Sequence, residues 1–91
     1  MPYRLIYSSS YERRAGKFLK KHPHVIGQYQ KVLELLTLNP QHPSLRLHGL
    51  KGSLSGLYSV SINMSYRIVL DFIIQDGDIL LVDIGSHDDV Y

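Results

Sequence analysis

The sequence contains no cysteine, and all of its apolar runs are short. The lack of cysteine excludes a disulfide framework and a thiolate metal site. No apolar run reaches the roughly 20 residues that a membrane-spanning helix needs. The N-terminal stretch MPYRLIYSSSYERR also lacks the apolar segment of a secretory signal. We therefore expect a cytoplasmic protein that has no membrane partner.

Acidic residues are nearly missing from the first two thirds of the chain. Residues 1–67 carry all ten Lys and Arg but only two acids, a balance of +8, whereas residues 68–91 carry six Asp and no Lys or Arg. A basic body of this kind suits a polyanionic partner such as nucleic acid, or an acidic protein. The alternative is that the lysines simply face water and keep the protein soluble.

The remaining composition is that of a globular protein. The chain has 91 residues, and a hydrophobic content of 44% with 20% charged residues separates it from disordered chains. A chain of this length has room for one modest core. We therefore expect a single domain over residues 1–91.

Two amphipathic helices are predicted after a first strand at residues 3–8. Ser9 with Glu12 three residues later forms a capping-box pattern for a helix start. Pro23 ends this helix, and a second helix runs to Asn39-Pro40. The apolar stripe of the first helix contains Ala15, Phe18 and Leu19, and that of the second contains Val25, Tyr29, Val32, Leu33 and Leu36. The short connection between them predicts an antiparallel helical hairpin.

Three more strands are predicted in the C-terminal part, at residues 57–63, 66–74 and 78–85. The Asp76-Gly77 pair before the last of them is a strong hairpin signal, so the three should form an antiparallel meander. The fold class is therefore α+β, with the order β-α-α-β-β-β and a helical hairpin packed on one face of an antiparallel sheet. Residues 40–56 show no period, and we expect them to run along the rim of the sheet.

Alternation along the strands assigns side chains to two faces. We expect the helices to cover an apolar face made of Tyr58, Val60, Ile62, Tyr66, Ile68, Leu70, Phe72, Ile74, Leu80, Val82 and Ile84. The opposite face receives Ser59, Ser61, Arg67, Asp71 and Asp83. No predicted element covers this second face, and continuing the alternation through Gly85 adds His87 to it. Arg67 and His87 are therefore expected to share one polar surface beside the basic segment 40–56.

Cations, histidine and tyrosine on one surface suit a phosphodiester substrate. RNA cleavage by 2′-hydroxyl attack needs one group to take a proton, one to protonate the leaving 5′-oxygen, and positive charge on the phosphorane. Histidine can fill either proton role, arginine grips phosphate at two points, and tyrosine stacks on a splayed base. This chemistry needs no cofactor. We expect no metal site, because the five histidines are scattered.

Each candidate residue also has an ordinary structural reading. Arg67 can form a surface ion pair with Asp71 on the same strand. His87 can be an exposed tail residue, and Tyr91 can pack on the end of the sheet. His48 can hydrogen-bond backbone carbonyls within its loop.

Three motifs, taken in order, resemble the C-terminal half of the RelE/ParE superfamily, the toxins of type II toxin–antitoxin modules. They are L-x-G-x-x-x-G-x-Y-x-x-x-I at residues 50–62, Y-R-I-V at residues 66–69 and G-x-H at residues 85–87. The preceding β-α-α order also fits, so the resemblance covers nearly the whole chain. It implies a RelE-like fold. For members of the RelE, YafQ, YoeB and HigB types it also implies a ribosome-dependent endoribonuclease that cuts mRNA in the A site.

The resemblance implies roles for four residues. Arg67 matches the arginine of the family's strand motif, which is implied to stabilise phosphate. His87 matches a YafQ-type histidine, implied to be a general acid or base. Tyr91 matches the terminal aromatic residue of the family, and His48 matches a loop histidine of the YafQ type.

The sequence departs from the YafQ type at two positions. That type has a histidine and an aspartate on its middle strands, and the matching residues here are Ser61 and Ser65. The proton-transfer partner of His87 therefore stays open between His48 and Tyr91.

The resemblance also implies binding partners. Arg46 and Lys51 stand where RelE-like toxins carry loop cations, and we expect them to hold RNA together with His42, which precedes Pro43. The partners would be mRNA on the ribosome and a small acidic antitoxin, which agrees with the basic body. Two alternatives on the same fold remain, a ParE-like DNA gyrase inhibitor and a non-catalytic, degenerate toxin.

Overall fold

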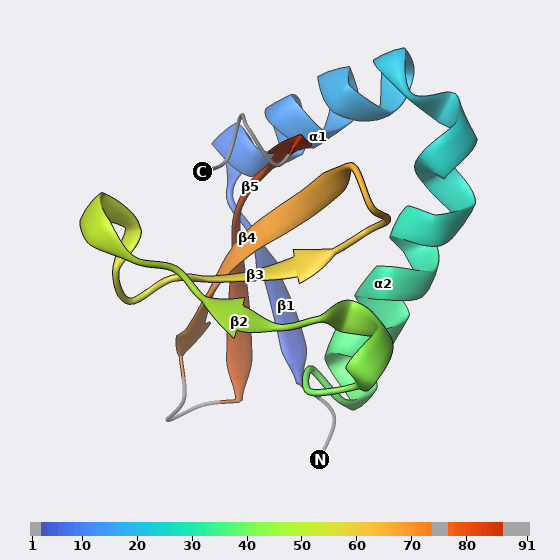
Figure 1. Ribbon diagram of the computed structural model, residues 1–91. Coiled ribbons are helices and arrows are strands. Elements are labelled where there is room, and N and C mark those ends of the chain that lie inside the picture. The colour runs from blue at the N-terminus through green and yellow to red at the C-terminus, as the bar shows by residue number, and fades with distance from the viewer. Residues whose placement is uncertain (1–2, 74–76, 87–91) are drawn as a thin grey trace.

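The computed structural model describes residues 3–73 and 77–86, apart from the side chain of Ile73. These residues form a five-stranded sheet in the order β1-β5-β4-β3-β2, with two helices packed against it (Figure 1). The strands are β1 (Arg4–Tyr7), β2 (His48–Gly49), β3 (Tyr58–Ser61), β4 (Tyr66–Ile73) and β5 (Asp78–Ser86). The helices are α1 (Ser9–Lys21) and α2 (Ile26–Leu38), and short 3-10 turns cover Pro23–Val25, Pro43–Leu45 and Gly52–Leu54.

The predicted helical hairpin is confirmed, with one correction at its start. The N-cap of α1 is Ser8, whose Oγ accepts a hydrogen bond from the backbone N–H of Tyr11 at 3.1 Å, and not Ser9. An N-cap residue needs extended backbone, and Ser8 has it (φ −78°, ψ 156°) because it directly follows β1. Pro23 begins the 3-10 turn that joins the two helices, as expected.

The first strand gives the sheet its mixed character. The three C-terminal strands form the predicted antiparallel meander. We expected an antiparallel sheet throughout, but β1 pairs with β5 in parallel, so the sheet is mixed. A parallel pair needs a long crossover, which the helical hairpin begins. Arg4 and Asp78 are register partners in this pair and form a two-pronged ion pair with N–O distances of 3.0 and 2.9 Å.

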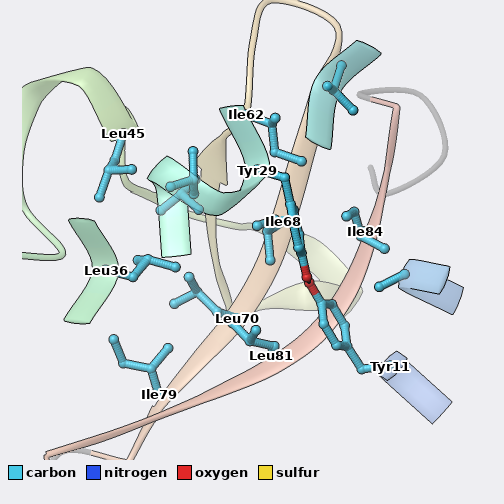
Figure 2. Close-up of a cluster of buried hydrophobic side chains, with 14 residues drawn as sticks. Tyr11, Tyr29, Leu36, Leu45, Ile62, Ile68, Leu70, Ile79, Leu81 and Ile84 are labelled. Carbon is cyan, nitrogen blue, oxygen red and sulfur yellow. The ribbon is translucent and has the colours of Figure 1, made fainter. Parts of the chain in front are cut away.

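The core lies between the helices and one face of the sheet, which we call the core face (Figure 2). The predicted stripe of α2 is confirmed, since Tyr29, Val32 and Leu36 are buried. From α1 the core also receives Tyr11, which the predicted stripe missed. The hydroxyl groups of Tyr11 and Tyr29 lie 2.8 Å apart and hydrogen-bond each other inside the core. Because each hydroxyl satisfies the other, two polar groups are tolerated in an apolar interior.

The predicted alternation of β5 is correct only in its second half. Ile79 and Leu81 are fully buried in the core, where Leu80 and Val82 were expected. The ladder to β4 pairs Leu70 with Leu81 and Val69 with Asp83, so Val82 is an extra residue in a β-bulge. A bulge inserts one residue and reverses the alternation from that point on. Ile84 therefore returns to the core face as predicted.

The segment between α2 and β3 follows the rim of the sheet, as expected. His48 and Gly49 pair with β3 and form a two-residue edge strand. The rest of the segment contains the turns Pro43–Leu45 and Gly52–Leu54. Within the described part of the chain, neither helix has the length and apolar character needed to cross a bilayer.

Candidate functional site

The face of the sheet opposite the core, which we call the open face, carries Arg67 on its central strand. Arg67 pairs across the ladder with Ser61 of β3 and with Gly85 of β5. The first of these neighbours has a short side chain and the second has none. The Nε and NH1 atoms of Arg67 are buried. A partly desolvated guanidinium attracts phosphate more strongly than one surrounded by water.

The open face is less exposed than the sequence indicated. Ser59, Ser61 and Val69 are all buried, although no predicted element covers them. Val69 is separate from the core cluster, as its place on the opposite face requires. Ser61 is short, and its hydroxyl donates a hydrogen bond at 2.6 Å to the carbonyl oxygen of Asn63, away from solvent. Among the described residues of this face, the edge strand is exposed at His48, whereas Arg67 is half-buried.

His48 lies on the same face as Arg67 but at the edge of the sheet. It pairs with Ser59, two residues before the ladder partner of Arg67, so the two Cα atoms are roughly 12 Å apart. The Nδ1 atom of His48 lies 3.3 Å from the carbonyl oxygen of Arg46. A carbonyl oxygen only accepts, so Nδ1 is the donor, and in the neutral ring Nε2 is then the basic nitrogen. This arrangement suits a general base.

The predicted RNA-binding residues fall into two groups. Lys51 lines a groove of about 260 Å³ together with His48. Arg46 and His42 line a separate groove of about 340 Å³. The Nδ1 of His42 accepts a hydrogen bond from the backbone N–H of Ser44 at 3.2 Å, so this ring also caps the 3-10 turn that follows it.

Arg46 has an unusual backbone conformation. Its φ angle is 50°, in the left-handed region that favours glycine. The position lies between the turn Pro43–Leu45 and β2. Left-handed backbone at a residue with a long side chain is retained where the surrounding structure holds it.

Asp83 belongs to the sheet edge and not to the surface around Arg67. Arg14 of α1 reaches its carboxylate at 3.3 Å and donates a second bond, of 2.8 Å, to the carbonyl oxygen of Val82. The β1 ladder ends at Leu81, so this arginine covers backbone that β1 no longer pairs. Arg14 was not among the predicted site residues, and here it serves the fold.

Two predicted catalytic residues, His87 and Tyr91, lie outside the described residues. The last described residue is Ser86, which is the ladder partner of Tyr66. The roles of His87 and Tyr91 remain predictions from the sequence.

Solved structures with the same arrangement of elements are toxins. YafQ from E. coli strain BL21(DE3) superposes with a TM-score of 0.79 at 15% identity, over 98% of each chain. The chain has the RelE-like toxin fold. The E. coli DinJ-YafQ toxin–antitoxin complex matches with a TM-score of 0.78 at 17% identity, over 100% of this chain and 99% of that chain. A metal-bound toxin from Helicobacter pylori matches with a TM-score of 0.77 at 23% identity, over 100% of both chains.

The likeness to these toxins lies in the fold and not in the sequence. No protein-family model and no curated protein matches this chain. The predicted β-α-α-β-β-β order is confirmed. Among the described residues, the short β2 is an additional strand that the sequence analysis did not predict. A two-residue strand carries too little alternation to be recognised from sequence.

Proposed function

We propose that this chain is the toxin of a type II toxin–antitoxin module and that it cleaves mRNA, with the ribosome presenting the substrate in its A site. The observation that carries the proposal is the position of Arg67 at the centre of the open face of a RelE-like fold. In this proposal the guanidinium group, which lies between Ser61 and Gly85, supplies the positive charge that binds the phosphodiester.

The proposed reaction is an attack of the ribose 2′-hydroxyl on the adjacent phosphorus. A 2′-oxygen–phosphorus bond forms and the bond to the 5′-oxygen breaks, which leaves a cyclic phosphate and a new 5′-hydroxyl. Arg67 stabilises the negative charge that grows on the phosphorane. His48 takes the 2′ proton through Nε2, and His87 gives a proton to the leaving oxygen. Tyr91 orders the flanking base or phosphate.

The rim of the sheet supplies the remaining contacts in this proposal. Arg46, His42 and Lys51 hold the RNA backbone on either side of the scissile phosphate. Phosphate contacts of this kind make binding fall as the salt concentration rises. No metal or cofactor takes part, because each proton and charge role has a side chain assigned to it.

The proposed protein partner is an acidic antitoxin. The DinJ-YafQ complex from E. coli and the YoeB-YefM complex from Staphylococcus aureus are solved with their partners, on folds like this one. The basic balance of residues 1–67 suits an acidic partner that competes with RNA.

The experiment that tests this function is induced expression followed by mapping of new 5′ ends on a reporter mRNA. We expect growth arrest and cleaved mRNA with the wild type, and cleavage slowed by about 10²–10³-fold in Arg67→Ala. Arg67→Lys keeps the charge but loses the planar guanidinium group, so we expect its cleavage rate to lie between those of the wild type and Arg67→Ala. Arg13→Ala is the matched control, because Arg13 is an exposed cation of α1 and not of the open face.

The same experiment separates the alternatives. Growth arrest with intact mRNA and DNA damage would show a gyrase inhibitor, and no arrest at all would show a degenerate toxin. Cleavage by Arg67→Ala at the wild-type rate would overturn the proposed site. Repeating the assay on purified RNA, with and without ribosomes, tests whether the ribosome is required.

A further inference from the structure

A third hollow lies at the edge of the sheet, near the candidate site. It has a volume of about 450 Å³, and we call it the edge groove. Its walls come from three distant segments: the turn Pro23–Val25 with the start of α2, the turn before β2, and the end of β3 with its connection to β4. The residues that matter most are His24, Gln28, Arg46, Ser61, Asn63 and Met64.

The edge groove lies one strand away from Arg67. Ser61 lines the groove and is also the ladder partner of Arg67. Neighbouring strands lie roughly 5 Å apart. A chain of nucleotides with one phosphate at Arg67 therefore brings the next nucleotide to the groove.

The polar groups of the groove favour a ligand that offers hydrogen-bond acceptors. Arg46 and His24 line it, and the described residues of its lining include no acidic side chain. Asn63 uses its Oδ1 to accept from the backbone N–H groups of Ser65 at 2.8 Å and Tyr66 at 2.9 Å. These two bonds fix the orientation of the Asn63 amide. The Nδ2 atom therefore points away from the turn and can donate a hydrogen bond. Nothing among the described residues accepts a hydrogen bond from that Nδ2.

The apolar wall of the groove is suited to a flat ring. Met64 is 81% exposed at its rim, and Val25 and Ile62 lie within the lining. A thioether packs well against aromatic faces, and unstacked RNA bases are bound by such contacts together with hydrogen bonds to their edges.

We propose that the edge groove binds the nucleobase next to the scissile phosphate, with the amide groups of Asn63 and Gln28 donating to its edge and Met64 packing on its face. The inference rests on the proposed function, because it takes Arg67 as the phosphate site. Donors at this edge select guanine, which presents the acceptors O6 and N7, over adenine, which presents a donor at N6.

The decisive variant is Asn63→Asp. It retains Oδ1 for the turn and replaces the Nδ2 donor with an acceptor. We expect the preference for guanine over adenine beside the cut to fall by about tenfold, while cleavage continues at other sites. The readout is the sequence profile of new 5′ ends from a pool of RNA, which a loss of overall activity does not alter.

A second variant covers the case in which Asn63→Asp fails to fold. Gln28→Ala removes an exposed side-chain amide of α2 that lines the groove. Gln30→Ala is the control, because it removes an equally exposed amide of the same helix that does not line the groove among the described residues. We expect only the first to change the cleavage profile. Equal profiles for the wild type, for Gln28→Ala and for a folded Asn63→Asp would overturn the proposal.

Binding measurements distinguish this inference from the proposed function. Fluorescence anisotropy with uracil pentanucleotides that carry one guanine or one adenine reports base preference without any cleavage. A guanine preference that Asn63→Asp removes supports the groove even if the wild type cuts no RNA, in which case the proposed function fails alone. Binding of an oligoglutamate peptide that shifts the Met64 methyl signal, with no RNA binding, would overturn the groove proposal.

Discussion

Strand β4 contributes alternate residues to the core face and to the open face of the sheet. Ile68 and Leu70 point into the core and are fully buried, whereas Arg67 and Asp71 point to the open face and are half-buried. Successive residues of one strand thus belong to different environments, one filled by aliphatic side chains and one with a cation at its centre. Changes on the core face should alter the stability of the fold. Changes on the open face should alter binding and catalysis.

The largest effect is expected from moving residues between the two faces. Deletion of Val69 shifts Leu70 relative to Ile68, so one of the two must leave the core, and we expect the chain to remain unfolded. Deletion of Val82 removes the extra residue of the bulge and keeps every pair of the ladder. We expect that variant to fold, with a loss of about 1 kcal/mol for the hydrogen bond from Arg14.

Circular dichroism and urea unfolding of the two deletions measure this difference. Both remove a valine, and both sites lie near the same ladder position, so the comparison is matched. If both deletion variants are unfolded, the fold requires the bulge at Val82.

The next largest effect is expected at Ile68. Ile68→Ala removes buried aliphatic volume from the centre of the core face and should lower the free energy of unfolding by about 2–5 kcal/mol. Asp71→Ala, three residues later on the open face, is the control, and we expect it to change stability by about 0.5 kcal/mol or less. Urea titrations of both variants give these values. Similar losses would contradict the division between the two faces.

The buried hydroxyl pair of Tyr11 and Tyr29 should show strong coupling. Either Tyr11→Phe or Tyr29→Phe leaves one hydroxyl unsatisfied in the core and should cost about 1–3 kcal/mol. The double variant leaves no unpaired hydroxyl, so its loss should be smaller than the sum of the two single losses. A double-mutant cycle measures the coupling, and additive losses would show that the hydrogen bond contributes nothing.

The same pair predicts the behaviour of the protein in alkali. Burial raises the pKa of Tyr11 and of Tyr29 above their ordinary value of 10.0. Below about pH 10 both tyrosines are protonated in the folded and unfolded chains, and their contribution to stability is complete. Above that pH the unfolded chain ionises first, so stability falls as pH rises. In the double phenylalanine variant the fall between about pH 10 and 11 should be shallower in urea titrations.

The smallest effect is expected at the edge of the sheet. Asp78→Asn breaks the ion pair with Arg4, whose side chain is 73% exposed and returns to water, whereas the side chain of Asp78 is 10% exposed. We expect a loss of about 1 kcal/mol, which about 1 M salt should reduce only in part, because the carboxylate is shielded from solvent. Thermal unfolding at low and high salt measures it. A loss that salt does not change would show that hydrogen bonding, and not charge, joins these residues.

Much of the candidate site followed from sequence periodicity alone. Alternation placed Arg67 opposite the core, because a strand has a fixed period of two that side chains must obey. The same rule failed at Leu80 and Val82, because a bulge depends on how two strands meet and leaves no pattern in either one. The parallel pairing of β1 was missed for a similar reason, since it joins residues more than 70 positions apart in the chain.

The sequence by itself determined the α+β class, the helical hairpin, the meander and the basic body, because these depend on local period and composition. Tertiary structure alone decided which residues share a surface. His24, Gln28, Asn63 and Met64 belong to separate segments with no common pattern, and they meet only because α2 packs beside the connection from β3 to β4. Local periodicity is a property of neighbours along the chain. A binding groove is a property of neighbours in space, which chain packing creates.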